Sequence, residues 1–154
     1  MSSRPEVPQT GFALEKVYCS EQASRVVPPD DLPQDPEPQI NFGWDWRIVG
    51  PRTFEVILAV ALSPTLGRAE DCRVTLCGVF RILGPATSVS VSEFVRLQGP
   101  AILMPYLREA VSSLTGHGYF GQLLLPPINV HVLMQQRNPQ EATGSKQLES
   151  AEGQ

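Results

Sequence analysis

The residue types that could bind a metal ion are few in this sequence and poorly spaced. His117 and His131 stand fourteen residues apart, with no cysteine or carboxylate at ligand spacing. Cys72 and Cys77 are five residues apart on a predicted strand, so their thiols should point to opposite faces and cannot share one ion. We therefore expect two small apolar residues in or beside the core there, no metal site and no cofactor.

Residues for nucleophilic or phosphate chemistry are missing as well. No serine lies in a G-x-S-x-G turn, and no glycine-rich segment resembles a phosphate-binding loop. Arg108 and Glu109 are neighbours on a predicted helix, so they point in different directions and indicate a solvated face. The sequence does not predict an enzyme. A small α+β enzyme with a pocket at its sheet is the alternative, and it lacks a convergent set of polar groups.

The unusual feature is an apolar connection, YFGQLLLPP at 119–127, between two predicted helices. Loops normally lie at the surface and are polar, because their backbone groups need water. Gly116 and Gly118 precede this segment and Pro126–Pro127 end it, so it should pack its leucines against the protein body and leave a furrow. Such a furrow suits an extended apolar peptide, although each residue could instead belong to the core or to an oligomer interface. The candidate groove residues are Phe42, Trp44, Trp46, Tyr119, Phe120, Leu123, Leu124, Leu125 and Met134.

Four strands are expected to position this segment. The first begins at Phe12 and places Leu14 and Tyr18 on one side. Gly78 interrupts the alternation of the fourth strand, which indicates a bulge. The other strands are expected from Ile40 onward, over 53–62 and over 71–83.

Helices are expected to follow the strands. Ser90 and Glu93 have capping-box spacing, which predicts a short helix to Gly99. The last helix should begin around Asn129 and end before Pro139. This order predicts an α+β fold, with a four-stranded antiparallel sheet and helices packed on one face.

The start of the middle helix is open. Its apolar stripe runs from Leu103 to Leu114, and Gly116 lies just past its end. It begins either near Pro105 or at Pro100, with a kink at Pro105.

Composition indicates a single domain over 10–137 with flexible tails at 1–9 and 138–154, and an irregular proline-rich stretch at 26–39. The net charge of −4 argues against nucleic-acid binding. No apolar run is long enough to predict membrane insertion, and the first residues lack the apolar segment of a signal peptide. The three cysteines fit a reducing cytoplasm.

The segment ILMPYLREAVSSLTGHGYFGQLLLPPIN resembles the most recognisable part of the SecB family of bacterial protein-export chaperones. The departures from the family pattern are Gly121 in place of a proline, Met104 in place of an aromatic residue, and His117 where a basic residue is common. The resemblance covers roughly residues 11–136. The matching residues in the segment are Ile102, Leu103, Pro105, Tyr106, Arg108, Glu109, Gly118, Phe120, Gln122, Leu123, Leu125, Pro127 and Asn129.

The resemblance implies an ATP-independent holdase whose apolar loop forms one wall of a groove for unfolded polypeptide clients. It also implies a homotetramer built as a dimer of dimers, with sheets and helices supplying the two kinds of contact. The expected role is protein export. The alternative is a SecB-like chaperone with another client, such as a labile antitoxin.

The resemblance implies a partner as well, because acidic residues of the family's sheet bind a basic, zinc-binding tail of the motor ATPase SecA. Glu21 matches one of these acids. Arg25 and Arg73 stand where two others would be, and Asp71 replaces an apolar neighbour. Like charges disfavour a basic partner, so we expect weak SecA binding or none.

Overall fold

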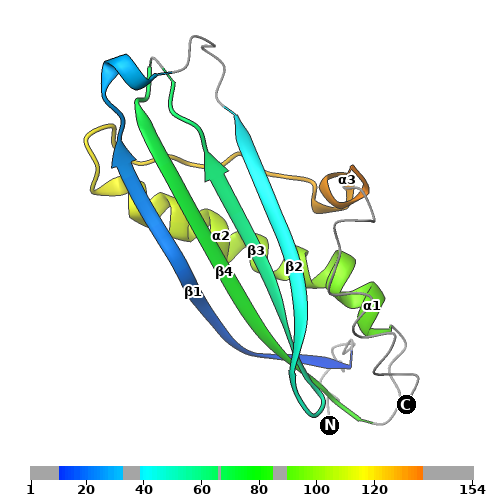
Figure 1. The fold of residues 1–154 in the computed structure, drawn as a ribbon. Helices are drawn as coiled ribbons and strands as arrows, with labels where there is room; N and C mark the ends of the chain where they lie inside the picture. The colour runs from blue at the N-terminus through cyan, green and yellow to red at the C-terminus, as the bar shows by residue number, and fades with distance from the viewer. Residues whose placement is uncertain (1–10, 33–38, 66, 85–89, 137–154) are drawn as a thin grey trace, which may run out of the picture.

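A long four-stranded antiparallel sheet supports the rest of the chain (Figure 1). The computed structural model describes residues 11–32, 39–65, 67–84 and 90–136. The predicted tails at 1–9 and 138–154 lie outside these residues. The strand order is β1-β4-β3-β2, and helices cross one face only, which confirms the predicted α+β fold. The strands are β1 (Phe12–Val26), β2 (Ile40–Gly50), β3 (Thr53–Leu62) and β4 (Glu70–Ile82).

The two helices expected before the apolar connection form one uninterrupted helical segment. Ser90 accepts a hydrogen bond from the Glu93 N–H, as the capping-box spacing predicts. Pro100 lies in the first turn of α2 and Pro105 lies inside it, so the start at Pro100 is the correct one. The helical elements are η1 (Pro29–Asp31), α1 (Val91–Glu93), the π-helical η2 (Phe94–Gln98), α2 (Gly99–Gly116) and α3 (Val130–Gln135). None of these described helices is long and apolar enough to cross a membrane.

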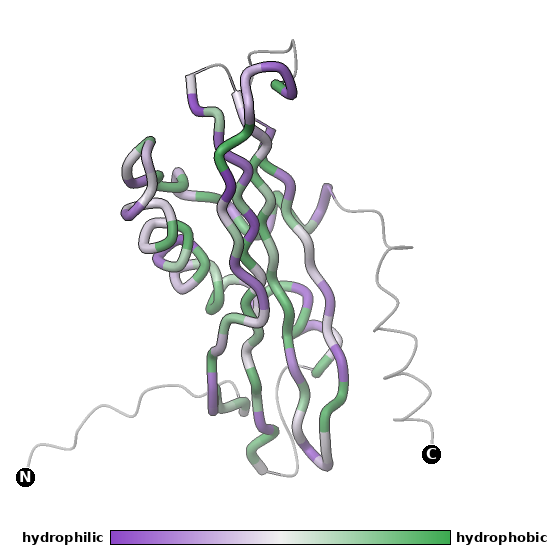
Figure 2. The backbone as a smooth tube through the Cα atoms, turned by 60° about the vertical axis from the view of Figure 1, so that its left-hand side comes forward, coloured by the Kyte–Doolittle hydropathy of each residue, from purple (hydrophilic) through white to green (hydrophobic). Residues whose placement is uncertain are grey.

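The core lies between the sheet and the helical segment. Even-numbered residues of β2, β3 and β4 face α2, which gives the hydropathy alternation seen along the strands in Figure 2. Four phenylalanine rings from β1, β3, β4 and η2 pack together, with ring centroids 4.3–5.8 Å apart. These rings are Phe12, Phe54, Phe80 and Phe94.

Gly78 does not form a bulge. The pairing of β3 with β4 continues unbroken through it, with Val56 opposite. Gly78 instead leaves room for α2, because a Cβ there would lie 2.7 Å from Leu103 Cδ2. A second close approach occurs at Gly99, where a Cβ would lie 3.0 Å from Val56 Cγ2.

The bulges lie in β1, and they change which residues face the core. The pairing of β1 with β4 shifts after Leu14 and again after Cys19. The first shift turns Tyr18 to the outer face of the sheet, so the predicted shared side with Leu14 is wrong. The Tyr18 hydroxyl there donates to the buried carboxylate of Glu55, which also accepts from Arg47 Nε at 2.5 Å.

This hydrogen bond to Glu55, together with burial, raises the pKa of Tyr18 to about 12. The phenol therefore stays neutral and keeps donating at physiological pH. Cys77 lies beside it on the outer face, whereas Cys72 lies in the core. The predicted opposite orientation of the two thiols is confirmed.

We predict that Gly78→Ala destabilises the fold by roughly 1–3 kcal/mol, because the added methyl group overlaps the fully buried Leu103. Urea unfolding followed by circular dichroism measures the change. Gly116→Ala is the matched control, since a Cβ there meets nothing within 4 Å. An unchanged midpoint for Gly78→Ala would show that Leu103 moves freely.

Candidate functional site

The connection between α2 and α3, residues 117–129, crosses the same face of the sheet as α2 (Figure 1). We call it the crossing loop. It contains no helix or strand, so its backbone groups need partners other than a regular ladder.

Side chains of α2 supply several of these partners. Thr115 Oγ1 accepts from the Leu123 N–H at 2.8 Å and donates to the Val111 carbonyl at 2.8 Å. Arg108 Nε donates to the Leu125 carbonyl at 3.2 Å. The side-chain amide of Gln122 donates to the Ser112 hydroxyl and adds a side-chain link between loop and helix. Positions 108, 112 and 115 form one stripe of the helix. Arg108 and Glu109 are both exposed, as predicted for a solvated face, and Arg108 also supports the loop.

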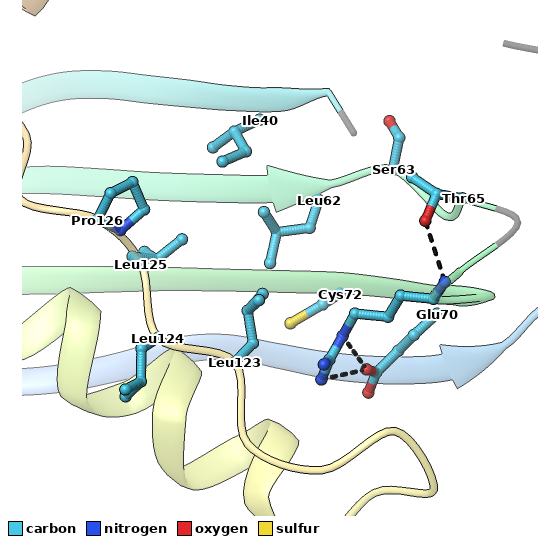
Figure 3. Close-up of a pocket in the computed structure, with 11 residues that line it drawn as sticks. Ile40, Leu62, Ser63, Thr65, Glu70, Cys72, Leu123, Leu124, Leu125 and Pro126 are labelled. Atoms are coloured by element: carbon cyan, nitrogen blue, oxygen red, sulfur yellow. Dashed lines mark hydrogen bonds and ion pairs between the residues drawn. The ribbon is translucent and has the colours of Figure 1, made fainter. Parts of the chain in front are cut away.

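The loop and the sheet enclose an apolar pocket of about 130 Å³ (Figure 3). Leucines of the loop face Ile40 of β2 and Leu62 of β3 across it. An apolar cavity of about 150 Å³ is known to bind benzene, so this pocket suits one leucine-sized or single-ring side chain. The lining residues are Ile40, Leu62, Ser63, Thr65, Arg68, Glu70, Cys72, Leu123, Leu124, Leu125 and Pro126.

The three loop leucines predicted as groove residues all line this pocket, yet they differ in exposure. Leu125 is 2% exposed and belongs to the core, whereas Leu124 is 69% exposed. Leu124 points away from Leu62 in Figure 3, while Leu123 lies on the side of Leu62. Leu124 is thus the leucine that offers most surface to a binding partner.

The other predicted groove residues lie apart from the pocket. Phe42, Trp44 and Met134 are partly buried and pack against the core, and Trp44 Nε1 donates to the Val95 carbonyl at 2.9 Å. Trp46 is 1% exposed, so the structure places it in the core instead of on a groove.

The aromatic pair of the loop lies at its other end, near α2. Tyr119 is 89% exposed and meets the ring of Phe120 edge-on at 5.1 Å between centroids. Neither residue lines the pocket, but both extend the apolar surface along the crossing loop.

Sequence reasoning missed the sheet side of the pocket. Ile40 opens the alternation of β2 and could have been included on that pattern. Three polar lining residues come from the β3–β4 connection (Thr65 and Arg68) and from the first residue of β4 (Glu70). No hydrophobic alternation in the sequence marks these positions as part of a site. Burial raises the pKa of the Cys72 thiol to about 11, so this pocket residue stays protonated and is a poor nucleophile.

The residues at the positions where the family binds SecA lie on the outer face, away from the pocket. Arg25 of β1 pairs with Asp71 of β4 across the sheet at 3.8 Å. Glu21 and Arg73 line a separate hollow on that face. The two acidic residues, Glu21 and Asp71, and the two basic residues, Arg25 and Arg73, therefore give this part of the outer face a net charge of zero. No group of three or more metal-binding side chains occurs within the described ranges.

A sequence profile described as preprotein translocase subunit SecB matches residues 7–141. The chain belongs to the SecB family. It is 37% identical over 127 residues to the protein-export protein SecB of Actinobacillus succinogenes, covering 78% of this chain and 76% of that protein. The SecB of Haemophilus ducreyi is 34% identical over 151 residues, covering 90% of this chain and 87% of that protein.

A solved SecB-like structure agrees with the fold. The SecB-like chaperone of Mycobacterium tuberculosis, in complex with a peptide from the HigA1 antitoxin, has a TM-score of 0.60. It is 17% identical in sequence and covers 77% of this chain and 88% of that one. SecB is a family of chaperones and not of enzymes, which agrees with the sequence prediction.

Proposed function

We propose that this SecB-family chaperone is an ATP-independent holdase, which captures unfolded preproteins on the crossing loop and keeps them competent for export from the cytoplasm. Family membership makes it a chaperone for protein export. The observation that carries the capture mechanism is an apolar loop held by hydrogen bonds over a leucine-sized pocket, with Leu124 left exposed.

The physical basis is that an unfolded chain is extended and presents apolar side chains without a core to bury them. One such side chain would enter the pocket, and neighbours would lie along Leu124 and Tyr119. β2 lies at the edge of the sheet, and its first residue lines the pocket. A client strand could therefore pair with β2 while its side chain occupies the pocket. Capture of the unfolded state then suppresses aggregation by mass action.

The alternative client, an antitoxin, is not favoured. That partner belongs to a structural relative whose low identity supports the shared fold alone. The relatives of higher identity are protein-export proteins.

We predict that Leu124→Asp weakens capture of an unfolded client about tenfold or more, because burying a leucine contributes roughly 1.5–3 kcal/mol. Fluorescence anisotropy with a labelled, denatured preprotein measures the affinity. The variant should fold and assemble normally, since the side chain is 69% exposed.

Leu125→Ala is the informative comparison for that experiment. This leucine is buried, so its loss should lower the free energy of unfolding by about 2–5 kcal/mol. If Leu124→Asp also unfolds the protein, Leu124 is a core residue and the capture role is wrong.

We also propose that the protein assembles as a homotetramer. Leu97, Ile102 and Tyr106 are exposed apolar residues on η2 and α2, and β1 is a second open edge of the sheet. A dimer of dimers needs two different interfaces, and this helix surface and this sheet edge would supply one each.

Sedimentation should accordingly give about four times the 16.9 kDa chain mass, with dimers at low concentration. Ile102→Asp should shift tetramers toward dimers, because a carboxylate is poorly tolerated in an apolar contact. A strictly monomeric wild-type protein at tens of micromolar would contradict the proposal.

SecA docking is the part of the family role that this chain should perform poorly. The balanced charges of Glu21, Arg25, Asp71 and Arg73 present no net attraction to a basic tail. Each reversed charge exchanges attraction for repulsion, at about 1 kcal/mol for exposed charges a few ångströms apart.

We predict that the wild type binds a zinc-loaded SecA tail peptide weakly or not at all in a calorimetric titration. Arg73→Glu should bind it about fivefold more tightly, the equivalent of about 1 kcal/mol. Arg96→Glu, an exposed arginine on η2, makes the same charge change away from the sheet and should have no effect. Low-micromolar binding by the wild type would overturn this prediction.

A further inference from the structure

The crossing loop is attached to the sheet by Arg68, which lies in the connection between β3 and β4. Its Nη1 donates to the Phe120 carbonyl at 3.4 Å, and its Nη2 donates to the Gly121 carbonyl at 2.5 Å. The guanidinium carbon also lies 6.0 Å from the centroid of the Phe120 ring. One side chain therefore satisfies two loop carbonyls and contacts an aromatic ring of the same segment.

Glu70, at the start of β4, orients this guanidinium. Arg68 Nε and Nη2 donate to Glu70 Oε2 at 3.1 and 2.9 Å, and the Ser24 hydroxyl of β1 donates to Oε1. The Glu70 side chain is almost fully buried. Gly118 passes so close that a Cβ there would lie 3.3 Å from Glu70 Oε1. The ion pair thus stands where β1, β4 and the crossing loop meet.

The remainder of the loop is held by α2, through Thr115 and Arg108. Gly121 is the last loop residue bonded to Arg68, directly before the segment bonded to α2, and it has a φ of +75°. Glycine adopts this left-handed conformation and others at little cost, so the backbone can pivot there. Without Arg68, the Phe120 and Gly121 carbonyls would lose their hydrogen bonds to the β3–β4 connection.

We propose that Arg68 is a positioning residue that fixes the width of the client pocket and so selects the apolar side chains that enter it. This inference rests on the proposed capture function. Arg68 and Glu70 line one end of the pocket, and the loop leucines line the other. With the loop held, the volume of about 130 Å³ admits leucine or phenylalanine but not the larger indole of tryptophan.

The test compares two extended peptides that differ only in a central leucine or tryptophan. The wild type should bind the leucine peptide about tenfold more tightly, a typical discrimination for a small size difference in an apolar pocket. Arg68→Met keeps the length of the side chain but removes the charge and the donors, and should reduce this preference to about twofold or less. The preference is a ratio, which a general loss of stability would not alter.

Two further variants make the result specific. Arg68→Lys keeps the charge but lacks the planar set of donors that reaches the carboxylate and both carbonyls, so it should also relax the preference. Arg81→Met removes a more exposed arginine–glutamate pair, from β4 to Glu15 of β1 at 3.1 Å, and should keep the wild-type preference. If Arg68→Met fails to fold, Arg68→Lys takes its place as the variant in which the leucine preference is measured.

Hydrogen exchange gives a readout that needs no client. The Gly118, Gly121 and Leu123 amides should exchange several-fold faster in Arg68→Met, while β3 amides should not change. A leucine preference retained within twofold in both Arg68 variants, or unchanged loop exchange, overturns the inference while leaving capture intact. Relaxed preference in Arg81→Met overturns it as well. A wild type that binds neither peptide overturns the capture function, and this inference with it.

Discussion

The close approach of α2 to the sheet is the constraint on which the rest of the structure depends. Two residues without side chains permit it, Gly78 under Leu103 and Gly99 over Val56. Because the helix lies this near, the residues at 108, 112 and 115 are within reach of the returning chain. The helix therefore contributes twice, by covering the core and by holding the crossing loop at a fixed distance from the strands.

That arrangement explains how an apolar loop can lie against a core. A buried connection normally leaves backbone groups without partners, and each one is costly. Here Thr115 and Arg108 from the helix and Arg68 from the β3–β4 connection bond to the loop backbone. The leucine side chains are then free to form the pocket and its rim. The polar side chains thus hold the loop backbone in place, while most of the pocket surface is formed by apolar side chains.

Features that follow from a local sequence pattern could be predicted from the sequence. Features that depend on strand pairing, or on one contact between distant segments, could not. The alternation of β2, β3 and β4 and the Ser90 cap are local patterns, and the structure has them. The second half of β1 has no alternation and forms because it pairs with β4, while its bulges turn Tyr18 to the other face. In the site, the leucine run was recognisable by composition. Arg68 and Glu70 were not, because their role arises only where distant segments meet.

The prolines that end the leucine run also bear on self-association. A run of three leucines, one of them largely exposed, is an apolar sequence of the kind that can pair into intermolecular β-sheets. Pro126 and Pro127 have no backbone N–H and cannot donate a hydrogen bond to a neighbouring strand. The leucine run is not in a strand, and its Leu123 N–H is already hydrogen-bonded to Thr115 of α2. These prolines therefore stand where gatekeeper residues flank an apolar segment and disfavour its pairing with another copy of the chain.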